Sequence, residues 1–129
     1  MINRILIIIT ISISISSNGY TETLHTKDFK LTEISKGLSE PWGMSFIDDD
    51  NLLITEKTGE IIRIDMRTGQ KYFINHELDF FYYGQGGLLD ILYKNGYVYI
   101  SYSEDREQGK SSTSIARGLY NKDKIIFKN

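Results

Sequence analysis

The chain has 129 residues, of which 40% are hydrophobic, 12% aromatic and 25% charged. This composition is typical of a globular protein and excludes a disordered, collagen-like or coiled-coil chain. The formal net charge of −2 provides no basic surplus for binding nucleic acid or anionic lipid. Because there is no cysteine, disulfides, thiolate metal sites and cysteine nucleophiles are excluded.

The first 20 residues have the layout of a secretory signal peptide. Arg4 gives a basic start, an uncharged isoleucine-rich stretch runs from Ile5 to Ile15, and small polar residues follow as far as Gly19. The uncharged stretch is shorter than the roughly 20 residues needed to span a bilayer, so we expect no stable membrane insertion. An amphipathic strand is the alternative, because isoleucine and serine alternate over residues 11–16. We expect residues 1–20 to be a signal peptide and the remainder to be periplasmic or secreted.

Short strands separated by turns are expected over the rest of the chain, and no segment shows a sustained 3.6-residue apolar repeat. An Asn-Gly pair at residues 95–96, between two alternating runs, is the strongest short signal for a hairpin. The sequence therefore predicts an all-β protein. The expected strands lie at residues 29–34, 43–47, 51–55, 60–65, 70–74, 88–93, 97–102, 113–120 and 124–127.

The strand pattern also repeats along the chain. Similar runs begin at Gly43 and at Gly87, about 44 residues apart, which is within the roughly 40–50 residues of one four-stranded propeller blade. A propeller closes a ring of about 4–8 blades, and two blades alone leave their outer faces uncovered. We therefore expect residues 21–129 to be the amino-terminal part of an incomplete β-propeller, containing roughly two blades.

Several motifs in series carry a resemblance to a known family. They are Pro-Trp-Gly-Met-x-Phe at residues 41–46, Thr-Glu-x-x-Gly at 55–59, Gly-Gln-Gly-Gly-Leu-Leu-Asp at 84–90, Tyr-Val-Tyr-Ile-Ser-Tyr at 97–102 and Ser-Ile-Ala-Arg-Gly at 114–118. In this order they resemble the opening of the glucose/sorbosone dehydrogenase family. Its members are soluble aldose sugar dehydrogenases that depend on pyrroloquinoline quinone (PQQ) and fold as six-bladed propellers. The family usually has a longer loop containing His-Pro after Leu-Leu-Asp, which is shortened here to residues 93–96.

The resemblance implies that the full-length protein is a quinoprotein that oxidises aldose sugars to lactones by hydride transfer to PQQ, with calcium as a second cofactor and an external electron acceptor. It places the general base on a histidine beyond Asn129, and the cofactor ligands beyond that point too. We therefore assign no catalytic residue and no metal ligand within this chain, and we expect the isolated chain to be inactive. His25 and His76 fall outside the matching motifs, and we expect His76 in a solvated loop. The alternative function is a non-catalytic exported propeller that binds or scaffolds, since a fold does not determine a function.

Gln85 is the candidate substrate-binding residue. The resemblance places the glutamine of Gly-Gln-Gly-Gly at the sugar pocket, where an amide can both donate to and accept from hydroxyl groups. Its flanking glycines let the backbone pass close to a ligand, although the same residues could simply form a flexible turn. Asp48–Asn51 lacks the glutamate and glycine of a calcium loop, so we expect a hairpin turn there. The aromatic run at 80–83 could stack on a sugar or quinone ring, but we expect it to pack in the core or rim of a blade.

Overall fold

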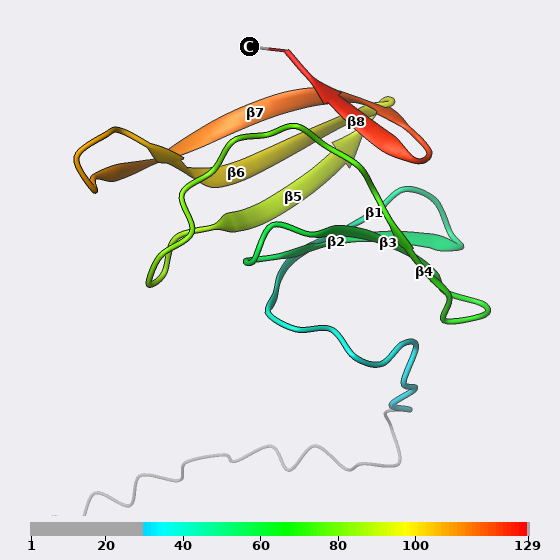
Figure 1. Ribbon diagram of the computed structural model, residues 1–129. Coiled ribbons are helices and arrows are strands. Elements are labelled where there is room, and N and C mark those ends of the chain that lie inside the picture. The colour runs from blue at the N-terminus through cyan, green and yellow to red at the C-terminus, as the bar shows by residue number, and fades with distance from the viewer. Residues whose placement is uncertain (1–29, 129) are drawn as a thin grey trace, which may run out of the picture. The chain divides into compact units, whose positions relative to one another are not determined.

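The computed structural model describes residues 30–128, which form two four-stranded antiparallel sheets with strands in chain order (Figure 1). Sheet 1 contains β1 (Pro41–Phe46), β2 (Asn51–Glu56), β3 (Ile61–Asp65) and β4 (Lys71–Phe73). Sheet 2 contains β5 (Leu88–Lys94), β6 (Tyr97–Asp105), β7 (Ser111–Asn121) and β8 (Lys124–Phe127). This confirms the all-β prediction and every expected strand from residue 43 onward. None of the described residues forms a helix long and apolar enough to cross a membrane.

The strand expected at residues 29–34 is wrong wherever the structure describes it, because residues 30–34 form no strand. The compact unit that carries both sheets begins at Thr32. Residues 35–37 are held by side-chain hydrogen bonds to the β3–β4 region instead of by a neighbouring strand. The Lys71 ammonium donates to the carbonyls of Lys36 and Gly37 at 2.9 and 2.8 Å, and the Ser35 hydroxyl donates to the Gly69 carbonyl at 3.0 Å. The predicted signal peptide at residues 1–20 and His25 lie outside the described residues.

The two sheets lie as stacked layers (Figure 1), and their facing sides form the main hydrophobic core. Side chains alternate between the two faces of each strand, so every second residue enters this core. Fully burying one such aliphatic side chain contributes about 1.5–3 kcal/mol. The buried members are Leu53, Ile61, Ile74, Leu88, Ile91, Val98, Ile100, Tyr102 and Ile125.

The other face of each sheet keeps large apolar side chains in contact with solvent. On β1, Met44 and Phe46 alternate with Gly43 and Ser45, which face β5, and both large side chains are exposed. On sheet 2, the exposed apolar residues are Leu92, Ile115, Leu119 and Ile126. Exposed apolar side chains gathered on one sheet face are typical of a surface that packs against another element. They are what the blade interpretation of the repeat predicts for two blades without neighbours.

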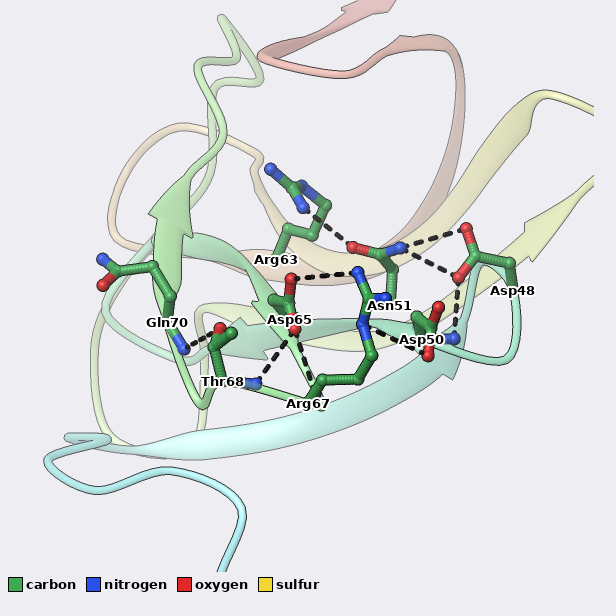
Figure 2. A network of polar contacts seen from close by, with 8 residues as sticks. All are labelled: Asp48, Asp50, Asn51, Arg63, Asp65, Arg67, Thr68 and Gln70. Atoms are coloured by element: carbon green, nitrogen blue, oxygen red, sulfur yellow. Dashed lines mark hydrogen bonds and ion pairs between the residues drawn. The ribbon is translucent and has the colours of Figure 1, made fainter.

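The acidic segment between β1 and β2 is a hairpin turn, as expected (Figure 2). The Asp48 carboxylate accepts hydrogen bonds from the Asp50 amide at 2.9 Å and from the Asn51 side chain at 2.9 and 3.1 Å. In the turn between β3 and β4, Asp65 accepts from the amides of Arg67 and Thr68 at 2.9 and 3.1 Å. Both carboxylates therefore serve their own turns. No group of three or more metal-binding side chains occurs between residues 30 and 128.

These hydrogen bonds give the stability of the protein a pH dependence. The Asn51 side chain and then the Asp50 amide lower the pKa of Asp48, and the Thr68 and Arg67 amides lower the pKa of Asp65. A carboxyl group with a lowered pKa stabilises the fold above its ordinary pKa of 3.8 and loses that contribution as the pH falls through the folded value. We expect the free energy of unfolding, measured with urea, to fall continuously below about pH 4.

NMR titration of the Asp48 and Asp65 carboxyl groups would show whether their lowered pKa values cause this loss of stability in acid. Repeating it in about 0.5 M NaCl is the control, because screening weakens distant charges but leaves hydrogen bonds largely intact. Ordinary pKa values for both groups would contradict the prediction.

Candidate functional site

Gln85 lies at the tip of a tight turn just before β5. The Gly86 amide donates to the Tyr83 carbonyl at 2.8 Å, which closes a four-residue turn with Gly84 and Gln85 at its centre. Gly84 has a φ of 57°, and a positive φ at the first central position alone is typical of type II′ turns, which need glycine there. The Gln85 side chain is exposed, and its amide makes no hydrogen bond within residues 30–128. That amide is therefore available to a ligand.

The two glycines after Gln85 fit the turn against sheet 1. Gly87 has a φ of 146°, and a Cβ there would lie far inside the 3.0 Å that real Cβ atoms keep from the Lys57 carbonyl oxygen. The same Lys57 carbonyl accepts a hydrogen bond from the Leu88 amide at 3.2 Å. The Ser103 amide of β6 donates to the Gly87 carbonyl at 2.9 Å. Only glycine permits this close backbone approach, so the spacing of glycines determines where the turn lies.

The Lys57 side chain reaches the same turn from the end of sheet 1. Its ammonium donates to the Gly84 carbonyl at 3.1 Å and lies 2.9 Å from Glu40 Oε2. The Glu40 contact is a charge contact, since Oε2 makes no hydrogen bond of acceptable angle within the described part of the chain. The Tyr82 ring centroid lies 5.6 Å from the ammonium. The Lys57 side chain is only 17% exposed, so these partners surround it.

Thr55 joins the two sheets beside this turn. The Thr55 hydroxyl is fully buried; it accepts from the Gly43 amide at 3.0 Å and donates to the Leu89 carbonyl of β5. Glu56 is also buried, and its Oε1 accepts from the Ser39 amide at 2.7 Å, which holds the segment before β1. The Thr-Glu-x-x-Gly motif therefore has a structural role, and its threonine is the junction between the sheets. The sequence signal was two polar residues ending an otherwise apolar strand.

His76 lies in a loop, as predicted, but its side chain is bound to the protein and not simply solvated. The ring is half-buried, with Nε2 2.7 Å from the Gly59 carbonyl and Nδ1 3.3 Å from the Leu78 amide. A backbone amide can only donate, so Nδ1 accepts and Nε2 carries the hydrogen. The Phe127 ring packs edge-on at 6.3 Å. Both ring nitrogens are used in holding the segment after β4, which gives His76 a structural role.

The aromatic run at residues 80–83 divides between core and rim, as predicted. Phe80 is half-buried and packs on Gly59, where a Cβ would collide with its ring. Phe81 is half-buried, and Tyr82 lies beside Lys57. Tyr83 is 78% exposed. Tyr82 is exposed too, so two tyrosines and Gln85 face solvent at this turn.

A cavity of the described residues lies elsewhere. It has a volume of about 880 Å³ and is lined by the segment after β4 and the ends of β6 and β8, including Asp79, Tyr102, Glu104 and Lys124. Burial and then the Glu104 charge raise the pKa of Tyr102. Gln85 does not line this cavity. The candidate site is therefore an exposed turn and not an enclosed pocket of this chain.

Comparison with known proteins identifies the family. Residues 38–129 match the Glucose / Sorbosone dehydrogenase family. The chain belongs to this family. It is 30% identical over 92 residues to the aldose sugar dehydrogenase YliI of Escherichia coli strain K12, covering 67% of this chain and 25% of that relative. This chain thus spans about a quarter of the length of that relative.

Solved structures of glucose/sorbosone dehydrogenases agree with the fold. A glucose dehydrogenase aligns with a TM-score of 0.70 at 29% identity, over 75% of this chain and 33% of that one. The PQQ-bound aldose sugar dehydrogenase of Streptomyces coelicolor aligns with a TM-score of 0.64 at 25% identity, over 77% of this chain and 33% of that one. A third of a chain is the share that two blades occupy in a ring of six. The two sheets are thus two blades of the predicted six-bladed propeller.

Proposed function

We propose that this chain is the amino-terminal part of an exported PQQ-dependent aldose sugar dehydrogenase, in which Gln85 binds the sugar. Membership of the family supports an oxidoreductase acting on aldose sugars. The observation that carries the proposal is the placement of Gln85, whose amide stands unpaired and exposed on a turn that the surrounding glycines hold fixed. Such an amide can donate to one sugar hydroxyl and accept from another.

The chain contributes to the sugar side of the reaction. When bound, PQQ would accept the hydride that the sugar loses. PQQ is a tricarboxylate, and the cation nearest to the turn, Lys57, is already engaged by Glu40 and the Gly84 carbonyl. The turn therefore does not fit PQQ, and we place neither PQQ nor calcium on the described residues. The role that we give this chain is to orient a sugar through Gln85.

The remaining parts of the proposal concern location and partners. The signal peptide at residues 1–20 would export the protein to the periplasm or beyond, leaving 21–129 as the start of the propeller. The partners would be an aldose sugar and an external electron acceptor, with calcium beside PQQ and a histidine base contributed by sequence beyond Asn129. Reading the gene past the Asn129 codon tests this directly. We expect an open reading frame with further blade-length repeats. A stop codon at that point would contradict the proposal that the gene encodes a sugar dehydrogenase.

Replacing Gln85 by alanine tests the sugar contact in the product of the complete gene. One neutral hydrogen bond contributes about 1 kcal/mol, so we expect kcat/KM for the aldose to fall about fivefold. The binding of PQQ, followed by its absorbance, should not change.

The matched control for this variant is Gln70→Ala, which removes another exposed glutamine, located in the turn before β4. We expect it to leave the kinetics unchanged. Equal kcat/KM in the wild type and in Gln85→Ala would contradict the role of Gln85. Absence of both PQQ binding and sugar oxidation in the wild type would favour the non-catalytic propeller.

A further inference from the structure

We propose that Lys57 is the positioning residue for Gln85, acting through the peptide that joins Gly84 to Gln85. The inference rests on the proposed function, since it assigns the means by which the sugar-binding amide is held in place. Lys57 directly follows β2 of sheet 1, whereas the turn leads into β5 of sheet 2. The contact therefore connects the two blades at the candidate site.

The environment of Lys57 fixes the position of its ammonium. The side chain is mostly buried, and a buried charge is costly unless it is paired and hydrogen-bonded. Glu40 supplies the opposite charge at 2.9 Å, and the Tyr82 ring lies within cation–π distance. The Tyr82 hydroxyl in turn approaches Glu40 Oε1 at 3.5 Å. Lys57 thus has one defined arrangement, in contrast to an exposed lysine that samples many rotamers.

The atom that Lys57 contacts is the one that orients Gln85. The Gly84 carbonyl and the backbone N–H of Gln85 belong to one planar peptide unit. Fixing the carbonyl oxygen therefore fixes the plane of the peptide from which the Gln85 residue continues. The space beside Gly84 is open, since a Cβ there would meet no atom within 4 Å. Among the described residues, Lys57 makes the one side-chain hydrogen bond to this peptide unit. Without the ammonium, the Gly86–Tyr83 hydrogen bond that closes the turn would restrain the peptide plane less tightly.

Two separate parts of Lys57 anchor two separate parts of the loop. Its backbone carbonyl holds the Leu88 amide, and its side chain holds the Gly84 carbonyl. A side-chain substitution therefore leaves the backbone anchor of β5 in place and releases only the tip of the turn. This separation makes a positioning role distinguishable from a general role in folding.

The test compares Lys57→Met with Lys57→Arg in the PQQ-loaded product of the complete gene. We expect Lys57→Met to raise KM for the aldose about tenfold with a smaller change in kcat, and Lys57→Arg, which keeps the charge and the donors, to restore most of the affinity. Lys71→Met is the matched control, because Lys71 also donates to two backbone carbonyls but lies away from Gln85. It should leave KM unchanged.

A double-mutant cycle supplies the decisive comparison. If Lys57 acts through Gln85, then Lys57→Met should have almost no further effect on kcat/KM when combined with Gln85→Ala. An equal loss with and without Gln85→Ala would overturn the positioning role.

Amide hydrogen exchange tests the same contact without any enzyme activity. We expect peptides covering residues 81–88 to exchange about tenfold faster in Lys57→Met, with Lys57→Arg and Lys71→Met unchanged. If the wild type oxidises no aldose, the proposed function fails, and unchanged exchange in Lys57→Met would separately overturn the positioning role. Should Lys57→Met not fold, Glu40→Gln removes the charge that holds the ammonium and is expected to accelerate the same exchange. Unchanged exchange in that variant would overturn the inference.

Discussion

Replacing Gly87 by alanine is expected to destabilise the protein by about 4 kcal/mol, close to the upper limit for a single substitution. Two penalties combine at this position. A φ of 146° lies in a region that residues with a Cβ rarely adopt, which costs about 1–3 kcal/mol. The added methyl group would also collide with the Lys57 carbonyl oxygen. That oxygen is part of the backbone and accepts from the Leu88 amide, so it cannot move without breaking the contact between the sheets.

Urea unfolding of Gly87→Ala beside Gly109→Ala separates the two penalties. Gly109 has a φ of 72°, but a Cβ there would meet no atom within 4 Å. Gly109→Ala therefore carries the backbone strain alone, and we expect it to cost about 1–2 kcal/mol. Equal losses in the two variants would show that β5 does not approach Lys57 as closely as described.

Replacing Thr55 by valine is expected to cost about 2–4 kcal/mol. Valine has nearly the shape of threonine but lacks the hydroxyl, so the core stays filled while two backbone groups lose their partner. These are the Gly43 amide of β1 and the Leu89 carbonyl of β5. Each buried group left unsatisfied costs about 1–3 kcal/mol. The effect of this substitution thus measures the polar link between the blades.

Thr55→Ser is the matched control, since it removes a methyl group but keeps the hydroxyl. Thermal or urea unfolding of both variants gives the comparison, and we expect the serine variant to lose about 1 kcal/mol from the deleted buried methyl group. If valine proved as stable as threonine, the Thr55 hydroxyl would not link the two strands.

Strands and turns could be predicted from the sequence because their causes are local. The Asn95–Gly96 pair supplies two successive residues with positive φ, 52° and 81°, and the hairpin forms where predicted. Gly43 and Gly87 begin two runs that fold into equivalent sheets. The failure at residues 30–34 has an equally local explanation, since alternation alone does not provide a neighbouring strand. Lys71 and Ser35 bind this part of the chain by side-chain contacts that no periodicity reveals.

The candidate site could be predicted only in part. Gly-Gln-Gly-Gly identified the turn, because glycines at that spacing permit its backbone. The contacts that hold the turn join residues far apart in sequence, such as Lys57 with Gly84 and Glu40 with Tyr82. For the same reason the two bonds of His76 were missed, since one of its partners is the Gly59 carbonyl in an earlier turn.

The four strands of each sheet follow one another along the chain, and one further bridge joins Asn75 to Lys124 of β8. Each sheet can therefore form nearly all of its strand pairing from one contiguous stretch of polypeptide, without first closing a long loop. Residues 41–73 emerge ahead of β5 because they precede it in the chain, so sheet 1 can begin to form with Thr55 and Lys57 in place. The loop that carries Gln85 then docks on a finished template. The geometry of the candidate turn is in this way determined by the blade that precedes it.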